Sequence, residues 1–423
     1  MKPTTPQDAL AYFLARPPST IHLGLDRMRQ ALALLKNPES RFPAVHVAGT
    51  NGKGSTCAYV ASCLRAAGYK VGLYTSPHLE RVNERIAVDG APLDDETLGC
   101  RILEVLERLP NDLELTFFEL GTLVAFWHFA AARVDIAVIE TGLGGRLDAT
   151  NCCRPIVTAI SPISVDHTEF LGHSLGEIAK EKAGIFKSGV RAVSGRQGPE
   201  ALAVLKAAAA SQGTSLKVLG EQFFVDRDGE AQAFGYRGLR TTVKGLVPSL
   251  AGPHQVDNAA LAVACLEQVE DQGFAVSVEA ARQGLRDTRW PGRLETFAGL
   301  PKVVLDGAHN VGGIEALVAA IDSLFAGKPI HLVFGVLADK DASGMMARLF
   351  PKVTAVYLPR FDSPRAVAPS ELLDKGRRLA SRVEAFESVS GALEAACEGA
   401  GRDGLVLGAG SLVLVGQLRS LLR

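Results

Sequence analysis

Short apolar runs alternate along this chain with longer segments in which apolar residues recur every three or four positions. An uninterrupted apolar run of this length is typical of a buried strand, and the longer period is typical of a helix. In the first two-thirds of the chain the expected strands are residues 44–48, 70–74, 135–140 and 156–160, and the expected helices are residues 55–68, 120–134 and 174–185. Strands that alternate with helices predict right-handed crossovers and a mostly parallel sheet.

The pattern changes twice beyond this region. Between residues 222 and 248 turn residues come at close intervals, which predicts antiparallel strands. Pro291 and Gly292 then mark a hinge, and the alternation restarts. The later expected strands lie within residues 302–310, 330–336, 353–358 and 404–411. We therefore expect an α/β protein with an N-terminal domain, residues 1–293, and a smaller Rossmann-like α/β domain, residues 294–423.

Composition narrows the possible partners. The chain has 423 residues, 47% of them hydrophobic, which is enough for two or three packed cores. A formal net charge of -1 disfavours a broad nucleic-acid surface. The seven cysteines show no C-x-x-C spacing, so neither a zinc site nor a disulfide framework is expected. Without a signal-peptide core or a membrane-length apolar run, we expect a soluble cytoplasmic protein.

The segment GTNGKGS, residues 49–55, follows an expected strand and opens an expected helix. This context is that of a phosphate-binding loop, yet the spacing departs from G-x-x-x-x-G-K-[ST], because Val47 stands at the first glycine and Gly54 follows Lys53. The glycines let backbone N–H groups turn inward, Lys53 can meet phosphate charge, and Ser55 can reach Mg²⁺. The alternative is a glycine-rich turn with a surface lysine.

Other polar residues lie where expected strands end, which is where ligands bind in such sheets. Ser76 follows one strand and could supply an oxygen to a hard cation. Glu140 ends another, and a carboxylate there is not expected to be buried unpaired. Arg146 and Asp148 follow it in ETGLGGRLDATN and offer ligand hydrogen bonds, or else form an ion pair with each other.

Five further residues are candidates for the site, and three of them also have an ordinary interpretation. His167 is a candidate metal ligand, although a lone histidine is more often structural. Lys182 lies amid glutamates, and its spacing alone favours a surface ion pair. Asn258 lies near an expected helix start, where capping is the ordinary role. Arg293 at the hinge could contact phosphate, and Asp306 at a strand end is a credible ligand group.

Taken in order, the segments TIHLGLDR, VAGTNGKGST, YTSPHL, ETGLGGRLDATN, DHTEFLG, EKAGIFK, WPGR and LDGAHN closely resemble the folylpolyglutamate synthase/dihydrofolate synthase family of the Mur ligase superfamily. The resemblance covers nearly the whole chain. It implies that the shortened loop is the family's own form of the P-loop, so that the N-terminal domain is an ATPase domain.

The resemblance also implies roles for individual residues. The implied ATP contacts are Thr50, Asn51, Gly52, Lys53, Gly54, Ser55, Asn258, Arg293 and Asp306, and the implied Mg²⁺ ligands are Ser55, Ser76, Glu140 and His167. Lys53, His167 and Lys182 are implied to be catalytic, with Lys182 carbamylated. The implied substrate contacts are Thr116, Phe117, Phe118, Glu119, Leu147, Asp148, Ala149 and His309, with core packing or loop pairing as the ordinary alternative for the phenylalanines and Asp148.

The implied reaction is ATP-dependent addition of L-glutamate to dihydropteroate and to reduced folates through an acyl phosphate. This reaction belongs to folate biosynthesis, polyglutamylation and one-carbon metabolism. We expect small-molecule partners only, with no nucleic acid and no membrane, and a monomer. The alternatives are a folylpolyglutamate synthase without the second activity, a Mur-type ligase with another carboxylate acceptor, and a non-catalytic nucleotide switch.

Overall fold

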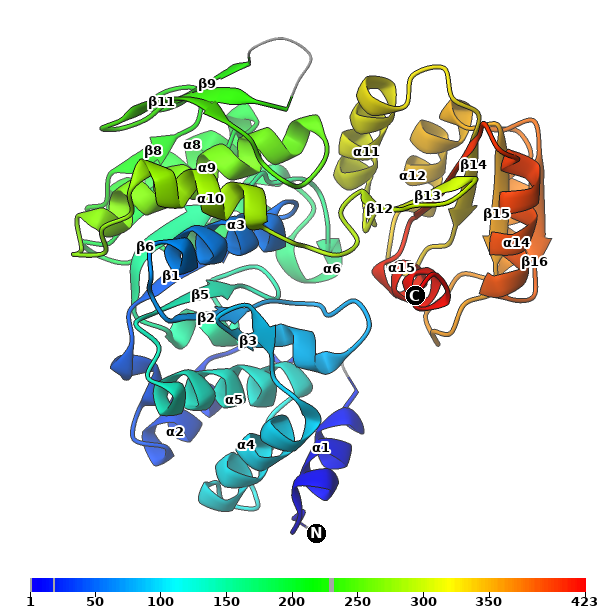
Figure 1. The fold of residues 1–423 in the computed structure, drawn as a ribbon. Helices are drawn as coiled ribbons and strands as arrows, with labels where there is room; N and C mark the ends of the chain where they lie inside the picture. The colour runs from blue at the N-terminus through cyan, green and yellow to red at the C-terminus, as the bar shows by residue number, and fades with distance from the viewer. Residues whose placement is uncertain (1, 18–19, 228–231) are drawn as a thin grey trace. The chain divides into compact units, whose positions relative to one another are not determined.

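The computed structural model describes residues 2–17, 20–227 and 232–423, and the chain divides into two compact units (Figure 1). Unit 1 comprises Met1–Ile163, Leu171–Val247 and Asp257–Thr288. Unit 2 comprises Ser164–Phe170, Pro248–Val256 and Arg289–Arg423. The main boundary between the units, after Thr288, therefore lies near the hinge expected at Pro291 and Gly292. Two short segments that precede this boundary, Ser164–Phe170 and Pro248–Val256, also belong to unit 2.

Unit 1 is built on an eight-stranded sheet in the order β4-β3-β2-β5-β1-β6-β7-β8. Its strands are β1 (Ala44–Ala48), β2 (Val71–Tyr74), β3 (Ile86–Val88), β4 (Ala91–Pro92), β5 (Ile136–Glu140), β6 (Pro155–Ile160), β7 (Arg191–Ser194) and β8 (Leu216–Val218). The strands from β2 to β8 in this order run parallel, whereas β3 pairs antiparallel with β2 and β4 pairs antiparallel with β3. The predicted mostly parallel sheet is thus confirmed, and the strands that sequence missed lie toward its two edges.

Helices cover both faces of this sheet (Figure 1). Those of unit 1 are α1 (Pro6–Leu14), α2 (Asp26–Leu34), α3 (Lys53–Ala66), α4 (Asp95–Arg108), α5 (Phe117–Ala132), α7 (Leu175–Ala183), α8 (Pro199–Ser211), α10 (Val278–Asp287) and most of α9 (Pro253–Glu270). Short helical segments of unit 1 are η1 (Pro38–Arg41), η2 (Val82–Arg85) and η3 (Ala149–Cys152). Those of unit 2 are most of α6 (Thr168–Leu171) and η4 (Phe350–Lys352).

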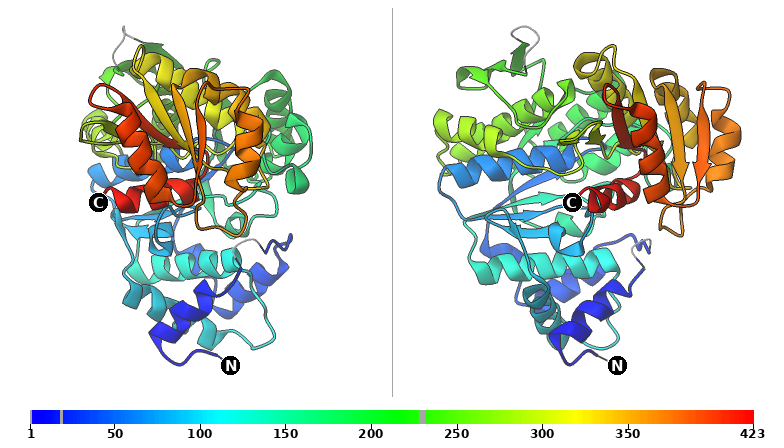
Figure 2. Two further views of the ribbon diagram at one scale, coloured as in Figure 1. Left: turned by 90° about the vertical axis from the view of Figure 1, so that its right-hand side faces the viewer. Right: turned by 45° about the vertical axis from the view of Figure 1, so that its right-hand side comes forward.

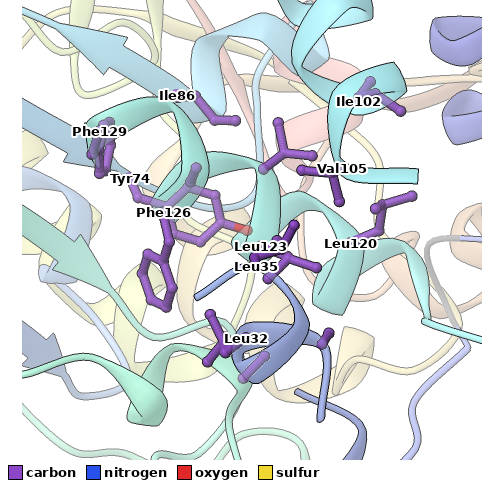
Figure 3. Packing of buried hydrophobic residues seen from close by; sticks show 14 of the residues in the cluster. Leu32, Leu35, Tyr74, Ile86, Ile102, Val105, Leu120, Leu123, Phe126 and Phe129 are labelled. Atoms are coloured by element: carbon purple, nitrogen blue, oxygen red, sulfur yellow. The ribbon is translucent and has the colours of Figure 1, made fainter. Parts of the chain in front are cut away.

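One core of unit 1 lies where α5 packs against the sheet and α4 (Figure 3). Phe126 and Phe129 of α5 are fully buried, and Phe42 meets the Phe129 ring edge-on at 5.8 Å between centroids. Burial of a side chain of this size contributes about 1.5–3 kcal/mol. This core therefore fixes α5, whose first turn carries several of the expected substrate residues.

The segment expected to form antiparallel strands does so as β9 (Phe224–Arg227), β10 (Phe234–Arg237) and β11 (Thr242–Leu246). Glu267 of α9 is buried beneath this small sheet and accepts hydrogen bonds from the Tyr236 hydroxyl at 2.8 Å and from the backbone N–H of Leu239 and Thr241. A buried carboxylate with so many donors ties the three-stranded sheet to α9.

Unit 2 has a six-stranded sheet in the order β12-β13-β17-β14-β15-β16, parallel except for β12 (Figure 2). Its strands are β12 (Glu295–Phe297), β13 (Lys302–Leu305), β14 (Ile330–Phe334), β15 (Ala355–Pro359), β16 (Val383–Phe386) and β17 (Leu405–Ala409). Its helices are α11 (Val311–Leu324), α12 (Ala342–Leu349), α13 (Pro369–Gly376), α14 (Val389–Ala400) and α15 (Leu412–Leu421). The predicted second α/β fold is confirmed.

Within the described residues, every helix is too short or too polar to cross a bilayer.

Candidate functional site

The glycine-rich loop connects β1 to α3 and is held in place by backbone contacts. The N–H groups of Thr50 and Asn51 donate to the carbonyl of Pro162 at 3.0 and 3.2 Å. Gly52 caps α3 with φ +86°, and a Cβ there would lie 2.4 Å from Oδ1 of Asn258. Both the left-handed backbone and the close approach require glycine at this position. The loop therefore presents the N-terminus of α3, where Gly54 and Ser55 form the first turn, as an anion site.

Lys53, Ser76 and Glu140 come together beside this loop. Glu140 ends β5 and is buried, and its Oε2 accepts the Ser76 backbone N–H at 3.1 Å. The ammonium group of Lys53 lies 3.8 Å from Oε1 of Glu140 and donates to the Thr50 carbonyl at 3.2 Å. The alternative of a surface lysine is wrong, because the Lys53 side chain is only 16% exposed.

The donors gathered here suit a hard divalent cation. The Glu140 carboxylate and the hydroxyl of the adjacent Ser76 are oxygen ligands of the kind that Mg²⁺ prefers. Mg²⁺ commonly keeps waters and phosphate oxygens as its other ligands. Among the residues described here, no three His, Cys, Asp or Glu side chains form a cluster. Glu140 and Ser76 fit a cation that completes its coordination with nucleotide phosphate oxygens and waters.

Lys182 is buried, with 4% of its surface exposed, and its Nζ donates to the Gly49 carbonyl at 2.7 Å. The interpretation of this residue as a surface ion pair is wrong. The neighbouring Glu181 instead pairs with Arg146 at 2.9 Å. The packing of α7 against the glycine-rich loop thus directs Lys182 toward the expected nucleotide site, although its sequence neighbours suggest an exposed residue.

Asn258 lies inside α9, which begins at Pro253, so the helix-capping interpretation is wrong. Its side chain instead lies against Gly52 of the glycine-rich loop. The implied contact of Asn258 with nucleotide stays a prediction.

The first turn of α5 holds four of the implied substrate residues. Thr116 and Glu119 form a capping box, and Glu119 also binds Arg27 at 2.9 Å. Phe117 is buried and its ring stacks on Phe13 at 4.4 Å between centroids, as the core-packing alternative predicts. Phe118 is half-buried, and a Cβ on Gly142 would lie 2.4 Å from its Cζ. Of the two rings, Phe118 is the one placed beside the ETGLGGRLDATN loop.

Asp148 holds that loop together. It is buried, and its carboxylate accepts the backbone N–H groups of Gly142 and Leu143 at 3.0 and 2.8 Å and that of Thr150 at 3.0 Å. Burial raises the pKa of Asp148, and these hydrogen bonds oppose the rise. The alternative of an Arg146–Asp148 ion pair is wrong, since Arg146 binds Glu181. The flanking residues Leu147 and Ala149 are half-buried and buried, respectively.

In unit 2, the loop after β13 is organised by Asp306. Its carboxylate accepts the N–H groups of Leu294 at 3.0 Å and Ala308 at 2.9 Å. The Arg293 guanidinium lies against Gly307, where an added Cβ would be 2.0 Å from Nη1. His309 binds the Gly307 carbonyl at 2.8 Å, and burial together with Lys340 lowers its pKa to about 4. Arg293, Asp306 and His309 are thus neighbours.

Sequence reasoning missed a second cluster in unit 2, formed by Asp166, Asn310 and Lys340. Asp166 Oδ1 accepts from Lys340 at 2.6 Å and Oδ2 from Asn310 at 2.9 Å. Burial alone would raise the pKa of Asp166, but Lys340 outweighs it and holds that pKa well below its usual value. His167 follows Asp166 with φ +51° and its Nε2 lies 3.4 Å from the Lys340 ammonium.

These positions determine which expected sites the structure assembles. Within unit 1 it brings together Ser55, Lys53, Ser76 and Glu140 around the loop, with Lys182 and Asn258 beside it. His167 belongs to a segment grouped with unit 2, so its place among the Mg²⁺ ligands stays a prediction. No local signal in the sequence links Asp166 to Lys340, which are 174 residues apart.

Comparison with known proteins places these features in a family context. The Mur ligase middle domain matches residues 47–266, and the Mur ligase glutamate ligase domain matches residues 292–412. A dihydrofolate synthase/folylpolyglutamate synthase of Bacillus subtilis is 39% identical over 88% of this chain and 89% of its own length. The Escherichia coli protein of the same name is 36% identical over 96% and 94%.

Solved structures agree with the sequence relatives. The structure of E. coli FolC in complex with DHPP and ADP has a TM-score of 0.91 and 34% identity, covering 99% of this chain and 97% of that one. Mycobacterium tuberculosis folylpolyglutamate synthase complexed with ADP has a TM-score of 0.90 and 31% identity, covering 99% of both chains.

Proposed function

The chain belongs to the dihydrofolate synthase/folylpolyglutamate synthase family of Mur ligases, and we propose that it joins L-glutamate to dihydropteroate and to reduced folates. It is an ATP-dependent ligase that uses Mg²⁺. The observation that supports the proposed chemistry is that Lys53, Ser76 and Glu140 lie together at a loop in which a side chain at Gly49 or Gly52 would collide with its neighbours.

The proposed reaction begins when the acceptor carboxylate attacks the γ-phosphate of ATP, giving an acyl phosphate and ADP. The amino group of L-glutamate then attacks the acyl carbon, and phosphate leaves as the amide forms. The first step brings two anions together. A pair of unit charges about 4 Å apart repels by about 4 kcal/mol at an effective dielectric constant near 20. Left uncompensated, this repulsion would slow the step by about three powers of ten.

The chain supplies several groups that offset this repulsion. The N–H groups at the start of α3 would bind phosphate oxygens. Lys53 would add a positive charge, because its 3.8 Å contact with Glu140 is loose enough to be exchanged for a contact with the nucleotide. Glu140 and Ser76 would hold Mg²⁺, which supplies further positive charge to phosphate oxygens. Arg293 of unit 2 is the proposed additional phosphate contact. Asp306 of unit 2 and Asn258 of unit 1 are proposed to orient the nucleotide.

We also propose that Lys182 is carbamylated. Its Nζ is already directed at the Gly49 carbonyl, and a carbamate would keep one N–H for that hydrogen bond while adding two anionic oxygens beside the loop. Electron density for Lys182 in a crystal of the liganded protein tests this modification. A plain lysine there would contradict it.

The proposed domains are residues 1–293 for ATP binding and residues 294–423 for glutamate ligation, which is supported by the separate matches of the two Mur ligase domains. Because ATP, L-glutamate and folates are cytoplasmic metabolites, we place the protein in the cytoplasm. We also propose that the protein is a monomer. Light scattering of the purified protein tests the monomer.

Phosphate release from purified protein with Mg-ATP and L-glutamate tests the proposed function. One reaction contains 7,8-dihydropteroate and another contains tetrahydrofolate, and omission of glutamate from each is the control. We expect release with both acceptors. Release with tetrahydrofolate alone would restrict the function to polyglutamate synthesis. No release with either, from folded protein, would redirect the search to carboxylate acceptors of other Mur-type ligases.

A further inference from the structure

Arg85, at the end of η2, carries a buried positive charge that none of the roles above uses. Only 8% of its surface is exposed. Its Nε donates to Nδ1 of His78 at 2.9 Å, and its guanidinium lies over the Phe117 ring at 5.0 Å from the centroid. His78 accepts in this hydrogen bond, and because an imidazole carries no negative charge it does not balance the charge of Arg85.

The comparison with Arg419, which is also buried, shows what is unusual about Arg85. Arg419 is 5% exposed, and its Nε lies 2.9 and 3.0 Å from the two carboxylate oxygens of Glu295. No carboxylate within the described ranges forms such a pair with Arg85, although Glu140 and Glu84 are near enough to influence it. Burial lowers the pKa of Arg85 accordingly, against the opposing effects of Tyr74 and Glu140. A buried charge without a paired carboxylate is costly.

The location of Arg85 points to the anion that would balance it. Its carbonyl accepts the Thr75 N–H at 3.0 Å, so its backbone is joined to the strand end that carries Ser76. Phe117, beneath the guanidinium, begins the helix that also presents Phe118. Arg85 therefore lies between the proposed Mg²⁺ ligand Ser76 and the proposed acceptor-binding turn of α5.

We propose that Arg85 binds the carboxylate of the acceptor substrate, an aryl carboxylate in dihydropteroate, before that carboxylate is phosphorylated. The inference rests on the proposed function and adds a residue that recognises the acceptor. Because Nε is occupied by His78, the terminal nitrogens of the guanidinium supply the remaining donors, in a fixed plane suited to a carboxylate. The aromatic ring and the low exposure would strengthen the pair relative to one in water.

The test compares binding of 7,8-dihydropteroate with binding of its uncharged carboxamide, in the full chain and without ATP. We expect the wild-type protein to prefer the acid. Arg85→Met should weaken binding of the acid by about 10- to 100-fold and leave binding of the carboxamide nearly unchanged. Arg85→Lys, which keeps the charge but not the planar donors, should fall between the two.

Arg108→Met is the matched control. Its guanidinium also lies 5.0 Å from the centroid of an aromatic ring, that of Trp127, but the residue is exposed. This variant should bind both ligands as the wild type does. Thermal unfolding of each variant shows whether a change in binding accompanies a change in stability.

Equal weakening of acid and carboxamide by Arg85→Met would overturn the proposal and leave Arg85 a structural role. Should Arg85→Met not fold, Arg85→Lys decides, because unchanged affinity for the acid would rule out recognition by the planar guanidinium. A wild-type protein that binds acid and carboxamide equally would overturn the inference without any variant. Failure of the proposed function appears separately, as absence of phosphate release by the wild-type protein with either acceptor.

Discussion

Each unit contains a lysine paired with a buried carboxylate, and the two pairs differ in tightness. In unit 1 Lys53 lies 3.8 Å from Glu140, which also binds the Ser76 backbone. In unit 2 Lys340 lies 2.6 Å from Asp166, and both side chains are less than a tenth exposed, at 7% and 8%. A loose pair can exchange its partner for a ligand, whereas a tight buried pair anchors the chain. The first should therefore govern catalysis and the second stability.

Loss of the Lys53 charge should produce the largest effect. In Lys53→Ala we expect kcat/KM for ATP to fall by about a thousandfold or more, since nothing else in the loop replaces a charge that offsets about 4 kcal/mol of repulsion. Phosphate release measures the effect, and unfolding in urea should be nearly unchanged. Lys206→Ala is the control, because Lys206 forms an exposed pair with Glu221 at 2.7 Å. Near-normal turnover by folded Lys53→Ala would refute the assignment.

Loss of the Lys340 charge should instead lower stability. Lys340→Met leaves Asp166 buried without its cation, and we expect the free energy of unfolding of unit 2 to fall by about 3 kcal/mol. Urea unfolding followed by hydrogen exchange in unit 2 measures this loss. Lys352→Met, which removes an exposed pair with Asp322, should cost about 1 kcal/mol or less. Equal effects of the two substitutions would contradict the comparison.

The same pair should make unit 2 sensitive to acid. The pKa of Asp166 is lower in the folded chain than in the unfolded chain, so its contribution is fully present above its unfolded pKa of about 3.9 and is lost as the pH falls toward the folded value. We expect the stability of unit 2 to decrease below about pH 4. The decrease should be smaller in Lys340→Met, where Asp166 titrates nearer its ordinary pKa. Parallel pH profiles for the two proteins would show that other carboxylates dominate.

The sequence predicts those strands and site residues of unit 1 that depend on the local pattern of apolar and polar residues. β1, β5 and β6 are continuous apolar runs at the centre of a sheet, and their ends identify the glycine-rich loop and Glu140. β3 and β8 are three-residue strands near the edges, too short to produce a pattern. The spacing of polar residues thus locates a site at strand ends without revealing the whole sheet around it.

Contacts between residues that are far apart in the sequence cannot be predicted from a local pattern. The glutamates near Lys182 suggest an exposed helix face, and only the packing of α7 shows that this side chain reaches Gly49, which is 133 residues away in sequence. Asp166 and Lys340 likewise have no shared periodicity. The family resemblance identified Lys182 but not the cluster of Asp166, Asn310 and Lys340. A motif indicates which residues are functional, but it does not show which side chains distant in sequence contact them.

The smallest expected effects separate the two adjacent phenylalanines of α5. Phe117 is 4% exposed and stacks on Phe13, so Phe117→Leu should lower the free energy of unfolding of unit 1 by about 1 kcal/mol. Phe118 is half-buried beside Gly142, so Phe118→Leu should spare stability and raise KM for dihydropteroate by about threefold through lost ring contact. Thermal unfolding and initial rates of phosphate release distinguish the two. If instead Phe117→Leu changed KM alone, the ring stacked in the core would be the one that meets the acceptor, and the division between core and site at the start of α5 would have to be reversed.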